Sequence, residues 1–242
     1  MHANILTLFP EMFPGTLGAA LAGKALADGK WTFTTINLRD FATDNYKTVD
    51  DTPFGGGAGM VIKPDIVHAA VQSLPQPGRK IYLSPRGKLL NQSLAQELSE
   101  EKTLTLLCGR YEGVDQRALD HHQFEEISVG DYILSGGELA AQVLLDAVIR
   151  LLPGVLNNAE THTEESFSDG LLEYPHYTRP AVWQGLEVPE ILTSGHHAKI
   201  KSWRHEQQIA ITQARRPDIW AARNNTACAG PMVRHSRKGE TG

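Results

Sequence analysis

The sequence predicts an α/β fold with a mainly parallel sheet, and three observations support this class. Short apolar runs alternate with longer runs of helical periodicity as far as Leu152. Three of the short runs end directly in glycine-containing loops, at residues 83–87, 108–113 and 128–137. A length of 242 residues, with 41% hydrophobic and 21% charged residues, is ordinary for a globular protein.

Five short runs are expected to form the strands of this sheet. They are residues 4–9, 31–38, 80–84, 103–108 and 125–129. Pro10 ends the first run, and the second is the richest in β-branched and aromatic residues. Each run is short enough for one crossing of a sheet, which is what the alternating pattern requires.

Helical patterns fill the intervals between these strands. They cover residues 11–27, 64–74, 91–99 and 138–152. Pro64 opens the second at a position where its missing N–H costs little, and Asn91 is expected to cap the third. A glycine-rich loop occupies residues 48–60.

The amino-acid composition of the chain changes after Pro153-Gly154. Residues 157–170 contain polar and acidic residues with few apolar anchors, which is typical of a linker or mobile loop. Ser194 is expected to cap a helix that runs to Arg216, where Pro217 stops it. Its expected apolar stripe is Ile200, Trp203, Ile211 and Ala214. The expected division is a domain over residues 1–156, a linker over 157–172 and a small helical domain over 173–242.

Charge is unevenly distributed along the chain. The whole sequence carries −5, but residues 195–242 carry +6 and the first 194 residues carry −11. A basic end on an acidic body indicates an anionic partner, with RNA or DNA the leading case. For residues 234–242 alone, a solvated and frayed terminus is the favoured interpretation.

No membrane span is expected. The most apolar long run, residues 139–156, is interrupted by Gln142, Asp146 and Arg150, and the chain begins with no basic, apolar leader. The two cysteines, Cys108 and Cys228, do not form a disulfide framework, which suits a reducing cytoplasm.

The glycine-rich loop is not a standard nucleotide motif. It lacks the Gly-Lys-Ser/Thr of a phosphate loop, and Met60 breaks the dinucleotide fingerprint that Gly55 and Gly57 begin. A flexible surface turn is the favoured interpretation. The functional alternative is a backbone that lets a flat base or ribose approach closely.

The loops after three of the strands predict a cofactor pocket, because ligands bind outside the carboxyl ends of parallel strands. Glycine backbone in residues 109–113 is suited to an adenine edge, and Glu112 is suited to a cationic sulfonium or amino group. A solvated turn acid is the alternative for Glu112. Val129, Ile133 and Leu134 in the third loop are suited to packing against an adenine face.

Two further groups have competing interpretations. Arg150 lies four residues after Asp146, so it forms either an exposed helical ion pair or a donor to a substrate oxygen that gains negative charge. Glu160, Glu164 and Glu165 are either solvated acids or include a general base on a closing loop.

The histidine pairs do not predict a metal site. His121-His122 and His196-His197 are adjacent pairs without the spacing of a zinc site, and the cysteines are distant. His197 lies near a helix start beside basic residues, where capping or RNA contact is the favoured interpretation.

Several segments together resemble the bacterial tRNA (guanine-N1)-methyltransferase family. The match covers essentially the whole chain and thins after about Arg216. The combination of the glycine loops with Pro175-His-Tyr-Thr-Arg-Pro180 is the most specific part. The segments that carry the resemblance are residues 8–13, 48–60, 82–87, 108–115, 128–138, 153–156, 170–180 and 194–200.

This resemblance implies a SPOUT methyltransferase domain in which residues 82–137 are threaded into a deep trefoil knot, followed by a small helical tRNA-binding domain. It also implies a homodimer with S-adenosylmethionine bound in the knot. The implied cofactor-binding residues are Tyr82, Leu83, Ser84, Pro85, Gly109, Tyr111, Glu112, Gly113, Ser128, Val129, Gly130, Asp131, Tyr132, Ile133, Leu134, Gly136 and Gly137.

The implied activity is methylation of N1 of guanine at tRNA position 37, next to the anticodon, in the cytoplasm. Arg150 would stabilise charge on O6. Glu165, where the family carries aspartate, would remove the N1 proton. Magnesium ion is expected from the family, at no identified site. The expected substrate-binding residues are Gly55, Gly57, Gly59, His176, His197, Lys199 and Arg204.

Departures from the family pattern leave other interpretations open. Besides Glu165, His196 stands where the family commonly has Asn, and Ala58 replaces a common proline. An RNA-binding protein with a vestigial cofactor pocket is therefore the first alternative. A dinucleotide-dependent oxidoreductase is the second, and the missing Gly-x-Gly-x-x-Gly argues against it.

Overall fold

A computed structural model of the chain describes residues 1–156, 165–167 and 169–228, with backbone alone over residues 225–228. The chain folds into two compact units, Met1–Asn157 and Asn158–Gly242. Each unit has its own secondary structure and is considered by itself.

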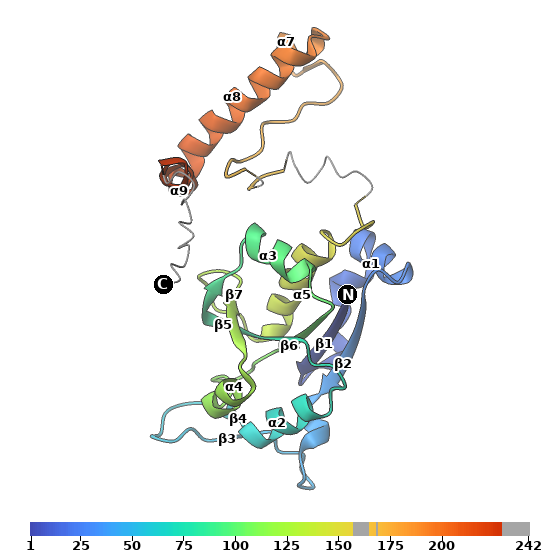
Figure 1. Cartoon of the computed structure of the whole chain (residues 1–242), viewed down its shortest axis with the longest axis vertical. Coiled ribbons are helices and arrows are strands. Elements are labelled where there is room, and N and C mark those ends of the chain that lie inside the picture. The colour runs from blue at the N-terminus through green and yellow to red at the C-terminus, as the bar shows by residue number, and fades with distance from the viewer. Residues whose placement is uncertain (157–164, 168, 229–242) are drawn as a thin grey trace, which may run out of the picture. The chain divides into compact units, whose positions relative to one another are not determined.

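The first unit is built on a five-stranded sheet, shown in Figure 1. Its strands lie in the order β2-β1-β6-β5-β7, and every neighbouring pair is parallel. The predicted α/β class with a parallel sheet is therefore confirmed. The strand bounds are β1 His2–Thr7, β2 Thr32–Asn37, β5 Arg79–Leu89, β6 Thr103–Leu107 and β7 Glu125–Ser128.

Helices cover both faces of this sheet (Figure 1). One apolar core lies among α1 (Ala20–Ala27), α3 (Gln92–Ser99), α5 (Gly137–Ile149) and the sheet. A second core lies between the sheet and the helices α2 (Pro64–Gln72) and α4 (Gln116–His122). Burial on two faces explains why β1 and β6 are buried along almost their whole length.

The predicted helix over residues 11–27 is wrong in its first half. Two 3-10 turns, Pro10–Met12 and Gly15–Gly18, precede α1. Pro14 lacks a backbone donor, and Gly15 adopts a φ of 56°, so the chain cannot continue as one helix there.

Two features were absent from the sequence prediction. The short helix α4 begins at the Asp115 side chain, which accepts a hydrogen bond from the N–H of Arg117 at 2.9 Å. The two-residue strands β3 (Asp50–Asp51) and β4 (Val61–Ile62) pair antiparallel and close the glycine-rich loop. Both are too short to produce a periodic signal.

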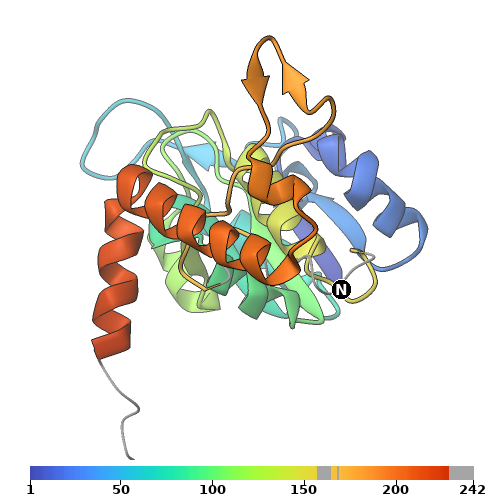
Figure 2. The same ribbon diagram turned by 90° about the horizontal axis from the view of Figure 1, so that it is seen from above.

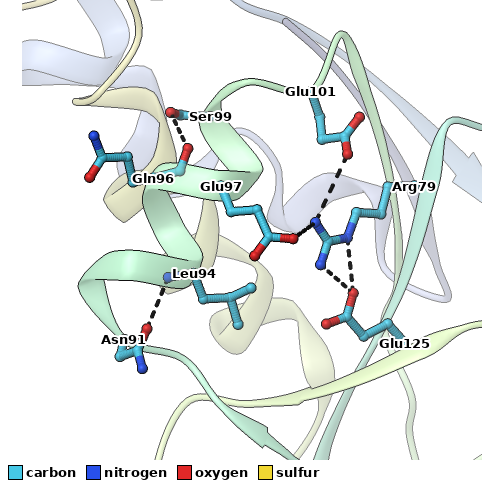
Figure 3. A network of polar contacts seen from close by, with 8 residues as sticks. All are labelled: Arg79, Asn91, Leu94, Gln96, Glu97, Ser99, Glu101 and Glu125. Atoms are coloured by element: carbon cyan, nitrogen blue, oxygen red, sulfur yellow. Dashed lines mark hydrogen bonds and ion pairs between the residues drawn. The ribbon is translucent and has the colours of Figure 1, made fainter. Parts of the chain in front are cut away.

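Polar contacts cap α3 and join it to β5, as Figure 3 shows. The Asn91 side chain accepts a hydrogen bond from the N–H of Leu94 at 2.9 Å, which confirms the predicted cap. Arg79 on β5 contacts Glu97 and Glu125, each at 2.6 Å. The guanidinium group therefore joins α3 and β7 to the same strand.

The second unit contains a hairpin and three helices within its described residues, and Figure 2 gives a clear view of them. The hairpin pairs β8 (Val182–Trp183) with β9 (Leu186–Glu187). The helices are α7 (Glu190–Thr193), α8 (His197–Arg215) and α9 (Pro217–Cys228). In the part of the chain that the structure covers, no helix is long and apolar enough to cross a membrane.

Two details of the predicted C-terminal helix differ from the structure. Ser194 does not cap α8: its hydroxyl donates to the carbonyl of Ile191 at 2.7 Å, at the end of α7, and His196 holds the N-cap position of α8. The buried side chain of α8 is Thr212, which was not part of the predicted apolar stripe. Ala214, which was part of that stripe, is exposed. The predicted stop at Pro217 is confirmed, since α8 ends at Arg215 and α9 begins at Pro217.

Candidate cofactor pocket

The loops that follow β5, β6 and β7 enclose one cavity of about 380 Å³. This volume lies in the range of small-molecule sites, about 300–1,000 Å³. Of the predicted cofactor-binding residues, Asp131 does not line the cavity. The others do: Tyr82, Leu83, Ser84, Pro85, Gly109, Tyr111, Glu112, Gly113, Ser128, Val129, Gly130, Tyr132, Ile133, Leu134, Gly136 and Gly137.

The first wall of the cavity comes from an irregularity in β5. The pairing of β5 with β7 shifts register between Leu83 and Lys88, so the intervening residues leave the regular ladder. Gly87 allows the two backbones to approach, since a Cβ there would lie 2.3 Å from the carbonyl carbon of Glu126. The displaced segment presents Ser84 and Pro85 to the cavity.

The second wall is the turn after β6. Tyr111 and Gly113 adopt φ values of 57° and 116°, and the N–H of Gly113 donates to the carbonyl of Arg110 at 3.0 Å. A Cβ at Gly109 would lie 2.8 Å from the hydroxyl oxygen of Tyr82. Burial raises the pKa of Tyr82, so this phenol is a neutral group of the cavity wall.

The third wall joins the loop after β7 to the start of α5. Gly137 donates its N–H to the carbonyl of Gly109 at 2.9 Å. A Cβ at Gly137 would lie 2.7 Å from the Cα of Cys108, so only glycine lets α5 start directly against the end of β6. Tyr132 and Ile133 in this loop are largely exposed.

A buried ion pair lies behind this junction, and sequence reasoning did not identify it. Glu138, in the first turn of α5, is fully buried and accepts a hydrogen bond from the Thr7 hydroxyl at 2.8 Å. Its other oxygen lies 2.9 Å from Nε of Arg110, close in distance but not aligned as a hydrogen bond. The Arg110 guanidinium group stacks 4.4 Å from the centre of the Phe9 ring, and Arg110 also lines the cavity.

The sequence offers one weak signal for this pair. An acid in the first turn of a helix is common and usually exposed, because it interacts favourably with the helix dipole. Nothing local distinguishes Glu138 from such an exposed acid, and Arg110 lies 28 residues earlier. Only the contact between β6 and α5 brings the two together.

Glycine and carboxylate groups meet at one edge of the cavity. A Cβ at Gly59 would lie 2.5 Å from Cγ of Glu112, and the N–H of Glu112 donates to the carbonyl of Met60 at 2.9 Å. The glycine-rich loop therefore reaches the pocket at Gly59. Gly55 and Gly57 have open space where a side chain would be.

The two predicted catalytic residues do not line the cavity. Arg150 is half-buried at the C-cap of α5, the opposite end of that helix from Gly137. The 13 residues of α5 place the two ends about 20 Å apart, at 1.5 Å per residue. Glu165 is half-buried in the second unit, and Glu160 and Glu164 lie outside the described residues.

The predicted RNA contacts in the second unit fall into two groups. His176 lies 2.8 Å from Glu173 and packs against the Tyr174 ring, over which the Arg204 guanidinium group also stacks at 4.7 Å. His197 and Lys199 are exposed in the first turn of α8.

Comparison with known sequences shows that this chain is similar to tRNA-modifying enzymes. The family described as tRNA (Guanine-1)-methyltransferase TrmD matches residues 1–222. The tRNA (guanine-N(1)-)-methyltransferase of Rhodospirillum rubrum is 62% identical over 222 residues, which are 91% of this chain and 93% of that protein. Proteins of the same name from Brucella ovis and Bartonella henselae are 57% and 54% identical, over 91% and 92% of this chain and 92% and 96% of their own lengths.

Proposed function

This chain belongs to the tRNA (guanine-1)-methyltransferase family, and we propose that it transfers the methyl group of S-adenosylmethionine to N1 of guanine at tRNA position 37. The cavity at the ends of β5, β6 and β7 is the observation that carries this proposal. It brings together three loops from distant parts of the sequence, as binding at the carboxyl edge of a parallel sheet requires.

The groups around the cavity fit S-adenosylmethionine. Gly109 and Gly137 line the cavity with backbone alone, which suits the close approach of a flat base. Val129, Leu134 and the rim residue Ile133 provide apolar contacts for such a base. When bound, S-adenosylmethionine supplies a methyl group attached to a positively charged sulfur. Glu112 carries the only carboxylate among the described lining residues, which suits that positive charge.

Glu165 and Arg150 have complementary roles in the proposed reaction. N1 of guanine carries a proton and is a weak nucleophile until that proton is removed. The Glu165 carboxylate accepts the proton as the N1–carbon bond forms and the carbon–sulfur bond breaks, and sulfur keeps the bonding pair as a neutral thioether. Negative charge develops on O6 as the proton leaves N1 and before the N1–carbon bond is complete, and the Arg150 guanidinium group stabilises this charge.

This assignment requires a homodimer whose active site is shared between subunits. The length of α5 keeps Arg150 about 20 Å from Gly137 of the same subunit. The exposed face of α5 carries Leu139 and Val143, each 49% exposed and four residues apart. Two such helices packed antiparallel about a twofold axis would cover these side chains and bring Arg150 of one subunit toward the cavity of the other.

Further features of the proposal follow from family membership. Residues 82–137 are expected to form the trefoil knot, and residues 1–156, 157–172 and 173–242 to act as methyltransferase domain, linker and tRNA-binding domain. Magnesium ion is expected from family membership, at no identified site. The expected location is the cytoplasm.

The tRNA contacts are proposed to lie mainly on the second unit. His176, His197, Lys199 and Arg204 there would meet the RNA, and the glycine-rich loop would approach the guanine through Gly55, Gly57 and Gly59. Lys199 and Arg204 would contribute positive charge toward the phosphate backbone.

The direct test is transfer of labelled methyl from S-adenosylmethionine to tRNA transcripts. A transcript with guanine at position 37 is expected to be labelled, and one with adenine there is not. Replacing Glu165 with Gln is expected to lower turnover by about 100-fold, since general base catalysis contributes about 10²–10⁴.

Three outcomes would count against the proposal. Tight binding of S-adenosylmethionine and tRNA without methyl transfer would indicate a vestigial pocket. Calorimetric binding of NAD but not S-adenosylmethionine would indicate an oxidoreductase. Near-normal turnover of Glu165→Gln would remove Glu165 as the base.

A further inference from the structure

Three histidines from two helices meet on the face of the sheet covered by α2 and α4. His68 lies on α2, and His121 and His122 lie in the last turn of α4. One ring nitrogen from each lies within 4.8 Å of the other two. Nδ1 of His68 and Nε2 of His122 are 3.1 Å apart and form a hydrogen bond.

We propose that this histidine cluster, His68, His121 and His122, binds a divalent transition metal ion, with Zn²⁺ the best match. Zinc takes imidazole nitrogens at 2.0–2.1 Å, so two ligands in a tetrahedral site lie about 3.3–3.4 Å apart. The His68–His122 pair is already near that separation. The third nitrogen needs a movement of about 1–1.5 Å, which rotation of an exposed imidazole ring can supply.

The surroundings of the cluster allow an ion to enter and leave. The side chains of His68 and His121 are exposed, whereas His122 is only 8% exposed. The buried histidine anchors the site, and the open side admits water as the fourth ligand, as in three-histidine zinc sites. The chemistry of three imidazoles and no carboxylate in the cluster favours Zn²⁺ over Mg²⁺ or Ca²⁺.

One charged side chain lies near the cluster. The positive charge of Lys80 acts on His122 and opposes a bound cation. Removal of that charge is therefore expected to strengthen metal binding.

The sequence alone did not predict this site. His121 and His122 are adjacent and cannot supply a zinc spacing by themselves, and His68 lies 53 residues before His121. The packing of α2 beside α4 on one face of the sheet brings the third imidazole into place. A bound ion would therefore cross-link these two helices.

The proposal is tested by titrating ZnCl₂ into the chelator-treated full chain, prepared without a polyhistidine tag, at about pH 7.5 where imidazole is mostly neutral. One equivalent is expected to bind. His68→Gln and His121→Gln are each expected to weaken binding at least tenfold, and the double variant to lose it. His205→Gln, which removes an exposed histidine from α8, is the matched control and is expected to bind as wild type does.

Thermal melting gives an independent readout. Excess Zn²⁺ is expected to raise the melting temperature of wild type and His205→Gln but not that of the double variant, since a ligand of the native state stabilises it. Both substituted side chains are exposed, and circular dichroism without metal checks that the variants fold. Fewer than half an equivalent bound to wild type, or affinity of both single variants within twofold of wild type, would overturn the proposal.

Discussion

The Arg110–Glu138 pair connects the cofactor cavity to the hydrophobic core. Glu138 is fully buried, with one oxygen bonded to Thr7 and the other beside Arg110. Arg110 extends to the cavity and donates to the carbonyl of Ser135 at 3.1 Å. If either side chain were removed, the charge of the other would lose its compensation. The contacts of Arg110 with Glu138 and with Ser135 also join the loop after β6 to the loop after β7 and the start of α5.

Replacement of Glu138 with Ala is expected to destabilise the protein by about 3 kcal/mol, because it leaves the Arg110 charge without its partner. Urea denaturation measures the change in free energy of unfolding. The double variant Arg110→Met/Glu138→Leu is the matched control and is expected to regain part of the loss, since it buries neither charge. If the double variant is destabilised by the sum of the losses measured for Arg110→Met alone and Glu138→Leu alone, the two side chains are not coupled.

Burial also determines the reactivity of Cys108. It raises the pKa of the Cys108 thiol well above its ordinary value of 9.0, with the Glu138 charge adding to the effect. The thiol is therefore neutral and shielded at neutral pH. The unfolded chain ionises at lower pH than the folded one, so the free energy of unfolding is expected to fall as pH rises above about 9.

In a Cys228→Ser background, Cys108 of the native protein is expected to react with iodoacetamide at pH 8 at least 100-fold more slowly than in urea, because both burial and the raised pKa suppress the thiolate. Mass spectrometry of the labelled chain measures the rate. Native labelling as fast as that of the unfolded chain would contradict the buried environment described for Cys108.

At the scale of elements, the α3 cap offers a clean measurement. Replacement of Asn91 with Ala removes the acceptor for the Leu94 N–H and is expected to lower the free energy of unfolding by about 1 kcal/mol. Asn91→Ser keeps a side-chain oxygen at the cap and is expected to lose less. Equal losses for the two variants in thermal or urea denaturation would show that the cap does not stabilise α3.

The sequence predicted elements with clear periodicity, and the prediction failed for segments that are very short or interrupted by proline and glycine. The strands β1, β2 and β6 and the helix α3 were predicted because apolar runs and a capping residue are local signals. The helix α4 has seven residues, too few for a periodic pattern, and residues 11–18 contain a proline and two glycines that divide an apparently helical stretch. Both differences arise where local backbone preference outweighs side-chain periodicity.

The candidate site was predicted only in part. Glycine loops directly after strands were readable from the sequence, and the structure gathers them around one cavity. Glu138 and His68 were not identified, because their roles depend on partners that only tertiary packing supplies. Pairing at such separations carries no spacing signal in a single sequence.

At the scale of the whole molecule, the proposed role of Arg150 predicts a second subunit, because the length of α5 separates Arg150 from the cavity of its own chain. This prediction is testable by mixing two inactive proteins. Gly109→Val is expected to block the cofactor cavity, since a side chain there meets Tyr82, and Arg150→Ala removes the proposed O6 donor. Each alone is expected to lose most activity. Subunit exchange is expected to restore about a quarter of wild-type activity, because half of the dimers are mixed and each contains one intact site of two.

Mixing two portions of the same variant is the control and is expected to give no recovery. Absence of recovery in the mixed sample, with exchange verified by a size-tagged subunit, would show that Arg150 acts on the cavity of its own chain. That result would contradict the shared active site while leaving the methyltransferase activity itself in place.

Methylation of guanine N1 at position 37 is the central claim, and nucleoside analysis of reacted tRNA tests it most directly. After reaction with S-adenosylmethionine, the tRNA is digested and its nucleosides are identified by mass spectrometry against authentic methylguanosines. We expect 1-methylguanosine as the product, located at position 37 by fragment mapping and missing when position 37 is adenine. Methylation at N2, N7 or a ribose hydroxyl, or 1-methylguanosine at another position, would contradict the account.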